Sequence, residues 1–365
     1  MNLDKNRVVI GLSGGVDSTV AAYLLKEQGY EVIGITMKTW DDPTDEYAEK
    51  IGGCCSLSAV EDARRVAAKL DIPFYVLNFK KPFKEHVIDY FVDEYEHGRT
   101  PNPCIACNKF IKFDRLLKKA HELGAYYVAT GHYAKIEQDE ETERYVLKAS
   151  KEKSKDQTYM LYNLSQWQLQ HMMMPLGSYE SKLEIRKISE KLDFSIASKP
   201  DSQEICFIPD DDYARYVTEN ATKKILPGNF VDGEGNVLGK HKGIIYYTVG
   251  QRKGLGITFG KPMYVVEIKA DTNEVVLGEN DRVFAKGLIA EDTNWIVFEE
   301  LKEPLHIMAK IRHAKRTESA MIIPMDDTHC RVLFEEPQRA VTPGQAVVFY
   351  KDDLVIGGGT IKQSF

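Results

Sequence analysis

The first ~150 residues alternate short apolar runs with stretches whose apolar residues recur at helical spacing. Four apolar runs are typical of buried strands: Val8–Leu12, Glu31–Met37, Pro73–Asn78 and Tyr126–Gly131. Between them, helical spacing covers Ser58–Leu70, Lys84–Tyr95 and Asn108–Leu123. This alternation predicts an α/β fold with a doubly wound, Rossmann-like parallel sheet.

The pattern changes twice further along the chain. Residues 138–158 are polar and predict an exposed hairpin or loop, and helical spacing returns over Leu161–Met173 and Tyr179–Leu192. Gly228–Gly235 has the turn residues of a short hairpin. Seven alternating runs then follow: Tyr264–Ile268, Glu274–Leu277, Leu305–Ile311, Ala320–Ile323, Arg331–Phe334, Ala346–Tyr350 and Val355–Lys362. Such runs predict a small antiparallel β-barrel. We therefore expect domains at 1–209, 210–278 (small, mixed or β) and 279–365 (barrel).

Composition narrows the class of protein. The chain has 365 residues, which favours two or three domains over a single core. It holds no apolar run long enough to span a membrane and no apolar signal core near Met1, so we expect a cytoplasmic protein. The net charge of −7 argues weakly against a nucleic-acid partner, because a local basic patch can bind RNA.

The first predicted strand leads into a glycine turn, Gly11-Leu12-Ser13-Gly14-Gly15-Val16-Asp17-Ser18, with a helix starting near Ser18. Glycines let the backbone approach a ligand closely, and amides at a helix N-terminus favour negative charge. The segment therefore predicts a site for nucleotide phosphates. It is not the common P-loop, since no Lys-Ser/Thr pair follows the last glycine. A strand-to-helix turn without a ligand is the alternative.

The second informative segment is Arg99–Phe113, which contains a Cys-x-x-Cys pair at Cys104 and Cys107. Pro101 and Pro103 predict an extended loop, with a helix beginning just after Cys107. A thiol at a helix N-terminus near lysines should have a lowered pKa, as a nucleophile requires. A zinc pair and an inert buried pair are the alternatives, although zinc would want further ligands at a recognisable spacing.

A third cysteine, Cys206, follows the polar run Asp201–Glu204, which favours a loop at a site. The alternative for a lone cysteine is a small buried apolar residue. The remaining cysteines, Cys54, Cys55 and Cys330, carry no such pattern and are interpreted as structural or incidental.

Six segments occur in an order that resembles one family nearly end to end. They are Ser13–Ser18, Arg99–Phe113, Gly131–Ala134, Lys155–Tyr159, Ser202–Phe207 and Thr248–Gly256. The glycine turn resembles the pyrophosphate loop of the N-type ATP pyrophosphatases, and the set resembles the tRNA-specific 2-thiouridylases.

The resemblance implies a mechanism. ATP with Mg²⁺ would bind on Gly11–Ser18, with adenine near Met37 and Gly131. The enzyme would adenylate the C2 oxygen of the wobble uridine and release pyrophosphate. Cys206 would carry a persulfide sulfur, and Cys107 would act as its partner nucleophile. A transient Cys107–Cys206 disulfide would remain for reduction.

The resemblance also implies macromolecular partners. These are tRNAs for Lys, Glu and Gln, and a cysteine desulfurase or sulfur-relay protein, with no membrane partner. Contacts to tRNA, including the flipped base, would come from Asn102, Pro103, Cys104, His132, Lys155, Asp156, Gln157, Arg312, His313 and Gln345. A solvated loop at Lys155–Gln157, a plain loop residue at His132 and ordinary barrel surface at Arg312-His313 are the alternatives. A monomer is the default.

One position departs from the family pattern. Many members carry Asp where this chain has Cys104, which puts any role of a carboxylate beside the base in doubt. Three thiols at Cys104, Cys107 and Cys206 could instead hold an iron–sulfur cluster with an open iron. The sequence leaves two other functions open: an ATP pyrophosphatase acting on a small metabolite, and a non-catalytic tRNA-binding protein.

Overall fold

The computed structural model describes residues 3–40, 57–192, 205–208, 210–258 and 260–365. The chain divides into two units, each with its own contacts. The first comprises Met1–Val87, Cys104–Asp211 and Asp353–Val355, and the second comprises Ile88–Pro103, Asp212–Asp352 and Ile356–Phe365.

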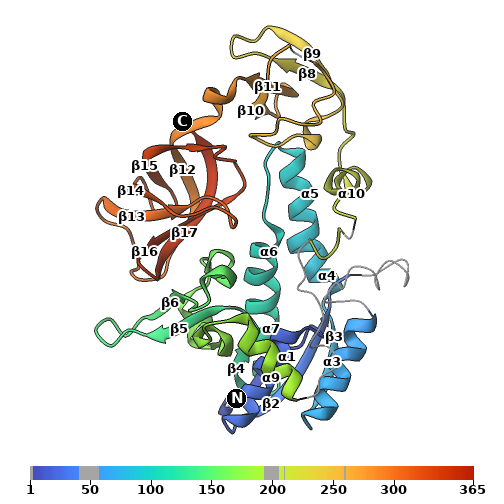
Figure 1. The fold of residues 1–365 in the computed structure, drawn as a ribbon, viewed down its shortest axis with the longest axis vertical. Helices are drawn as coiled ribbons and strands as arrows, with labels where there is room; N and C mark the ends of the chain where they lie inside the picture. Colours follow the sequence, from blue (N-terminus) through green and yellow to red (C-terminus); the bar gives the residue numbers. More distant parts are fainter. Residues whose placement is uncertain (1–2, 41–56, 193–204, 209, 259) are drawn as a thin grey trace. The chain divides into compact units, whose positions relative to one another are not determined.

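The first unit is built on a parallel sheet (Figure 1). Among the described residues its strands are β1 (Asp4–Gly11), β2 (Glu31–Lys38), β3 (Phe74–Asn78), β4 (Ala125–Ala129) and β7 (Met172–Met173), in the order β3-β2-β1-β4-β7. β2 and β3 lie on one side of β1, and β4 and β7 lie on the other. The order therefore reverses between β1 and β4, where the carboxyl ends of parallel strands open a crevice for ligands.

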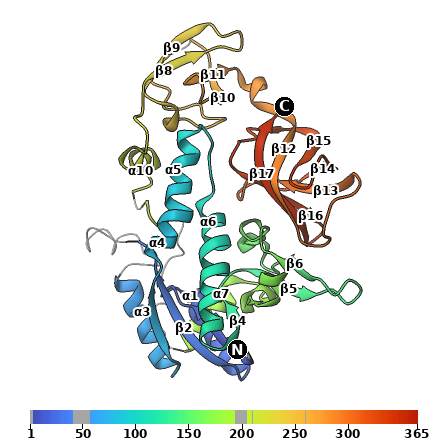
Figure 2. The same cartoon turned by 180° about the vertical axis from the view of Figure 1, so that it is seen from behind.

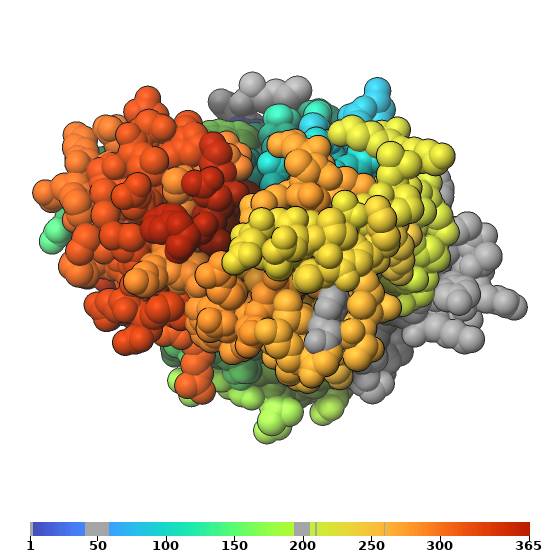
Figure 3. Space-filling model, turned by 90° about the horizontal axis from the view of Figure 1, so that it is seen from above, coloured from blue at the N-terminus to red at the C-terminus, as the bar shows by residue number. Residues whose placement is uncertain are grey.

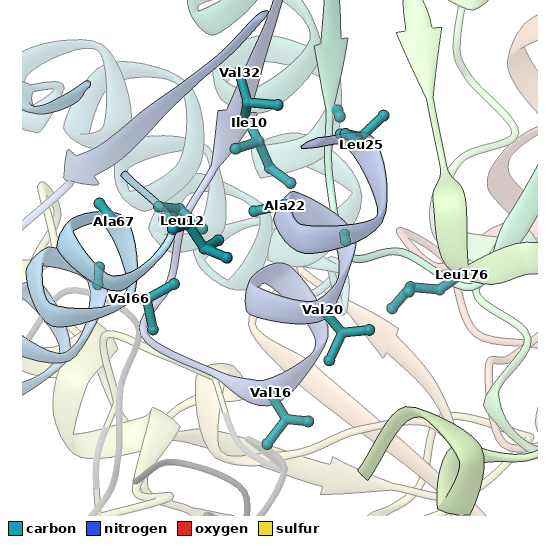
Figure 4. Packing of buried hydrophobic residues seen from close by; sticks show 14 of the residues in the cluster. Ile10, Leu12, Val16, Val20, Ala22, Leu25, Val32, Val66, Ala67 and Leu176 are labelled. Carbon is teal, nitrogen blue, oxygen red and sulfur yellow. The ribbon is translucent and has the colours of Figure 1, made fainter. Parts of the chain in front are cut away.

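Helices cover both faces of this sheet. Alternate residues of β1 point to opposite sides. Val8 and Ile10 join the core formed with α1 (Val16–Glu27), α3 (Leu57–Lys69) and α9 (Lys182–Lys191), part of which Figure 4 shows. On the other face, a Cβ at Gly11 would meet Leu116 of α7 (Leu116–Glu122) at 3.7 Å. The predicted doubly wound fold is confirmed.

Two continuous helical runs each contain a stretch of π-helix. The first consists of α4 (Lys80–Phe83), the π-helix η1 (Lys84–Ile88) and α5 (Asp89–Glu96). The second consists of α6 (Pro103–Ala106), the π-helix η2 (Cys107–Arg115) and α7. Wide helical turns of this kind are rare and are frequent at functional sites. The second helix thus begins at Pro103, and the expected start after Cys107 is wrong.

The polar region after β4 forms the expected hairpin, with β5 (Ala134–Gln138) pairing antiparallel to β6 (Tyr145–Ala149). Short 3-10 helices and α8 follow: η3 (Lys153–Lys155), η4 (Thr158–Met160), α8 (Gln166–Gln170) and η5 (Pro175–Ser178). The helix expected over Leu161–Met173 is therefore shorter. Its last residues form β7, because Met172 and Met173 pair with the edge of the parallel sheet at Val128 and Ala129.

The second unit is mainly β (Figures 1 and 2). After α10 (Tyr213–Asn220), a four-stranded sheet runs in the order β10-β11-β8-β9. Its elements, with two 3-10 helices, are β8 (Gly228–Val231), β9 (Val237–His241), η6 (Ile244–Tyr246), β10 (Tyr264–Lys269), β11 (Glu274–Gly278) and η7 (Asn280–Val283).

Residues 284–364, all described, form an antiparallel barrel. Its strands are β12 (Phe284–Trp295), β13 (Leu305–Lys310), β14 (Glu318–Pro324), β15 (Cys330–Arg339), β16 (Ala346–Lys351) and β17 (Leu354–Ser364). They run in the order β12-β15-β14-β13-β16-β17, and pairing of β12 with β17 closes the barrel. The expected barrel is confirmed, and Figure 3 shows the outer surface of these residues in orange and red. Among the described residues, no helix has the length and apolar character that crossing a membrane requires.

Candidate active site

The glycine turn lies at the carboxyl end of β1, at the point where strand order reverses. Gly14 has φ +69°, and a Cβ there would lie 2.4 Å from the carbonyl oxygen of Ala59. Only glycine fits this backbone without strain. Residue 14 is therefore glycine because both the dihedral angle and the neighbouring α3 require it.

The turn is tied together by two serines. The Ser13 amide donates to Ser18 Oγ (3.2 Å), and Ser18 Oγ donates to the carbonyl oxygen of Gly15 (3.2 Å). α1 begins at Val16, and its N-cap, Gly15, makes no side-chain capping bond. Because glycine has no side chain, the N-cap of this 12-residue helix offers no oxygen to the first-turn amides, which face the turn. An anionic phosphate fits such a cradle.

Asp17 is held by residues distant in sequence. Lys182 Nζ lies 2.5 Å and 2.6 Å from the two carboxylate oxygens, and Tyr133 donates its hydroxyl hydrogen to Oδ1 (2.8 Å). Only 11% of the Lys182 side chain is exposed, against 31% for Asp17. A partly buried carboxylate beside a phosphate site would repel the ligand, and this lysine offsets its charge.

Two further predicted nucleotide contacts lie at the same edge of the sheet. A Cβ on Gly131 would lie 2.7 Å from the Ser18 amide nitrogen, so the chain after β4 passes directly against the start of α1. Met37 is near the carboxyl end of β2, beside β1. The structure thus brings Met37, Gly131 and the glycine turn to one edge of the sheet, and this arrangement fits a nucleotide.

The cysteines of the second helical run differ in exposure. Cys104 is exposed in the first turn after Pro103, and Cys107 is partly buried one turn later. Proline is favoured at the first helical position because its missing N–H would be unpaired there anyway. The helix-terminus argument applied to Cys107 therefore fails, because the influence of a helix end fades beyond its first turn.

Cys206 lies on a short described segment, Ile205–Ile208, and is partly buried. Its neighbour Phe207 packs edge-on against Phe83 of α4, with ring centroids 5.8 Å apart. One turn along the same helix, His86 stacks on Phe110, with centroids 5.2 Å apart. Phe110 lies one turn after Cys107 in η2. The segments that carry Cys107 and Cys206 therefore pack on one helical surface.

The other cysteines follow no such pattern. Cys330 is fully buried in β15, and burial raises the pKa of its thiol to about 12. Cys54, Cys55 and the Ser202–Glu204 part of the Cys206 motif lie outside the described residues. Within the described part of the chain, no three His, Cys, Asp or Glu side chains gather in a way that could hold a metal ion.

The predicted tRNA contacts in the first unit are partly engaged in the fold. Gln157 Oε1 accepts from the Tyr133 amide (2.9 Å), and Asp156 accepts from the Ser150 amide (3.0 Å) and the Thr158 hydroxyl (2.6 Å). These bonds shape the loop after β6, of which Lys155 is also a part. The side chains of Asp156 and Gln157 therefore position this loop next to Tyr133, which in turn donates a hydrogen bond to Asp17.

His132 lies between Gly131 and Tyr133. Its Nδ1 is 2.8 Å from the Thr130 hydroxyl, and its ring centroid is 5.7 Å from that of Phe113. Burial, with nearby Lys112, holds the pKa of His132 well below its usual value. The imidazole is therefore neutral at physiological pH.

In the second unit, predicted tRNA contacts also support loops. Gln345 donates through Nε2 to the carbonyl oxygen of Thr100 (2.8 Å), just before Asn102. Arg312 donates to the carbonyl oxygen of Ala340 and to the Thr342 hydroxyl. His313 follows Arg312 after β13. Within this unit, Gln345 therefore fixes the Arg99–Pro103 segment.

Known protein families and relatives match nearly the whole length of the chain. Three family models match in succession: the tRNA methyl transferase HUP domain over residues 6–210, the tRNA methyl transferase PRC-barrel domain over 214–279 and the aminomethyltransferase beta-barrel domain over 285–361. The tRNA-specific 2-thiouridylase MnmA of Clostridioides difficile (strain 630) is 60% identical over 358 residues, which is 98% of each chain. MnmA 1 of Clostridium botulinum (strain Hall) is 60% identical over 98% of this chain and all of its own length.

The chain belongs to the tRNA-specific 2-thiouridylase family. The resemblance that the six ordered segments predicted is confirmed. Among solved structures, a 4-thiouridine synthetase–RNA complex with bound ATP matches at 20% identity and TM-score 0.34, over 56% of this chain and 45% of that one. NMN synthetase from Francisella tularensis matches at 16% identity and TM-score 0.32, over 60% and 78%.

Sequence reasoning missed two residues of this family member's candidate site. Tyr133 lies inside the Gly131–Ala134 segment but was assigned no role. No sequence pattern pointed to Lys182. It lies 165 positions from Asp17 in the sequence, and its helix begins with an ordinary Ser181 N-cap. A lysine that is buried in the fold looks like any other lysine in the sequence.

Proposed function

We propose that this chain is an ATP-dependent tRNA-uridine 2-sulfurtransferase. It adenylates the C2 oxygen of the wobble uridine, releases pyrophosphate, and replaces the AMP-bearing oxygen with sulfur to give 2-thiouridine. The observation that carries the proposal is the glycine turn at the carboxyl end of β1, where the strand order reverses, with a glycine N-cap and an Asp17 carboxylate paired with Lys182. The 60% identical relatives bear the name of this reaction.

The glycine turn, Gly11–Ser18, binds the phosphates of ATP through backbone amides and the Ser13 hydroxyl, with Ser18 holding the turn in shape. Met37 and Gly131 flank the adenine at the same edge of the sheet. Mg²⁺ accompanies ATP and offsets the phosphate charge. Adenylation is chemically needed because the uridine oxygen is a poor leaving group and AMP is a good one.

Cys206 carries the persulfide, and Cys107 is its partner. Cys107 attacks the inner sulfur of the persulfide, and the outer sulfur leaves as hydrosulfide and attacks C2, expelling AMP. Two cysteine thiols are thereby oxidised to a Cys107–Cys206 disulfide while the transferred sulfur is reduced. An iron–sulfur cluster on Cys104, Cys107 and Cys206 is not part of the proposal, because these residues form no metal-holding group in the described structure.

The substrate is tRNA, with the Lys, Glu and Gln isoacceptors expected from the family. The proposed tRNA-contacting residues are Asn102, Pro103, Cys104, His132, Lys155, Asp156, Gln157, Arg312, His313 and Gln345. We further propose domains at 1–209, 210–278 and 279–365, a cytoplasmic monomer, and a cysteine desulfurase or relay protein as sulfur donor.

The test is thiolation of an unmodified tRNA-Lys transcript with ATP, Mg²⁺ and a persulfide donor, read as 2-thiouridine by nucleoside mass spectrometry. We expect product from the wild type and none from Cys206→Ala or Cys107→Ala. Cys330→Ala, at a buried barrel cysteine, is the matched control and should form product. ATP consumption stimulated by a small metabolite but not by tRNA would overturn the proposal, as would tRNA binding without ATP turnover.

A further inference from the structure

Cys104 and Cys107 stand on consecutive turns at the start of one helical run. The run begins at Pro103 and continues without a break through Glu122. Residues three apart on a helix face the same side, with Cβ atoms roughly 5–6 Å apart. Cys104 is the exposed member of the pair and Cys107 the partly buried one. The two thiols are therefore neighbours that differ in access from solvent.

Cys206 is also partly buried, on a segment that packs against the same helical surface as η2. A disulfide between Cys107 and Cys206 would thus join two partly buried residues, which an external reductant reaches less readily than the exposed Cys104. Thiol–disulfide exchange requires that the attacking thiol reach the sulfur that it attacks. Cys104 lies beside Cys107 on the same helix and is therefore placed to attack the Cys107 sulfur.

We propose that Cys104 is the resolving thiol that returns the enzyme to its reduced state after each sulfur transfer. The inference rests on the proposed function and adds to it a third cysteine with a defined role. Its external partner is a dithiol reductant of the cell, which acts at the exposed end of the helix.

The resolving step is a thiol–disulfide exchange. The Cys104 thiolate attacks Cys107 Sγ, the Cys107–Cys206 bond breaks, and Cys206 leaves as a thiolate that takes up a proton. A Cys104–Cys107 disulfide forms with no net change in electrons. The external dithiol then reduces this disulfide, giving up two electrons and two protons and becoming a disulfide itself. Cys206 is free to accept the next persulfide before that reduction is complete.

The experiment follows the cysteines through one turnover and then many. Wild type, Cys104→Ser and Cys104→Asp are each run with tRNA, ATP, Mg²⁺ and a persulfide donor, with a dithiol reductant kept limiting. The ratio of steady-state rate to first-turnover rate is measured for each enzyme. Disulfides are mapped after a single turnover without reductant, followed by acid trapping and tryptic digestion. Cys104 and Cys107 fall on one tryptic peptide between Arg99 and Lys109, and Cys206 falls on another.

We expect the wild type to hold a disulfide within the single peptide, and both variants to hold a cross-link between Cys107 and Cys206. The ratio of rates should fall on the order of tenfold in both variants, because reduction of a partly buried disulfide becomes limiting. The aspartate variant carries the residue that many family members have, so agreement between the two variants excludes a fault specific to serine.

A Cys107–Cys206 cross-link in the wild type, with Cys104 still a thiol, would overturn the inference. So would variants whose ratio of rates equals that of the wild type. Both results are compatible with the proposed function, since 2-thiouridine would still form. Absence of 2-thiouridine from the wild-type reaction would instead contradict the proposed function itself.

Discussion

Asp17 shows what a single residue in the glycine turn depends on. A carboxylate beside bound phosphates is unfavourable unless its charge is offset. Lys182 does this from a helix far along the chain, and Tyr133 adds a hydrogen bond. The need for glycine at position 14 could be predicted from the sequence, since the turn itself demands it. The lysine could not, because only the folded chain brings α9 to the turn.

We expect Lys182→Met to lower kcat/KM for ATP about tenfold or more, because the partly buried Asp17 carboxylate would then face the phosphates uncompensated. The measurement is AMP formation with tRNA at varied ATP. Lys182→Arg should retain much of the activity. Lys187→Met, at an exposed lysine of the same helix, is the matched control. Equal kcat/KM values for Lys182→Met and Lys187→Met would refute a role for the pair.

His132 gives a pH dependence. Its pKa is lowered in the fold by burial, so the unfolded chain binds its proton more readily. The free energy of unfolding therefore falls as pH drops below the unfolded value of about 6.5. His121 and His241, whose pKa values burial also lowers, contribute in the same direction. Because several histidines contribute, the role of His132 is measured as the difference between variant and wild type in the free energy of unfolding that is lost on acidification.

We expect His132→Gln to remove on the order of 1 kcal/mol of the stability lost between about pH 7.5 and about pH 5.5. Urea unfolding at both pH values measures it. His306→Gln, at an exposed position in β13, is the matched histidine substitution against which the change is compared. A wild-type loss that persists in His132→Gln would show that His132 is not the group that titrates.

At the scale of elements, most helices and strands could be predicted and their ends could not. Strong periodicity located β1, β2, α3 and the barrel strands β13 to β17. Pro103 was interpreted as a helix breaker, yet it starts the helix, because proline is compatible with the first turn. β7 was missed because two residues added to a sheet edge leave no periodic pattern. β12 was missed because its run, Phe284–Trp295, contains glycine and a polar end.

The contact between α4 and the Cys206 segment yields a further prediction. Phe83 is 1% exposed and packs on Phe207. We expect Phe83→Leu to displace Cys206 and uncouple the reaction, so that AMP forms with less 2-thiouridine. The ratio of 2-thiouridine to AMP is the measurement. Phe91→Leu, at an equally buried phenylalanine of α5, should cost a similar ~1 kcal/mol of stability and keep the ratio. A normal ratio in Phe83→Leu would mean that this packing does not position Cys206.

At the scale of the whole molecule, the order of six segments was enough to predict the family, which the 60% identical relatives confirm. The division into units was harder to foresee. Ile88–Pro103 belongs with the later residues, tied by Gln345 to Thr100 and by Thr222 to Glu96. The residues in each of these contacts are more than 100 positions apart in the sequence, so no local sequence pattern predicts the contacts.

Activation of the uridine oxygen with AMP can be followed by the fate of that oxygen. An anticodon stem-loop or tRNA with ¹⁸O on C2 of the wobble uridine is incubated with ATP, Mg²⁺ and a persulfide donor. We expect AMP to carry the ¹⁸O and to form in step with 2-thiouridine. Formation of 2-thiouridine with AMP free of ¹⁸O would contradict activation with AMP, because the oxygen would then have left by another route.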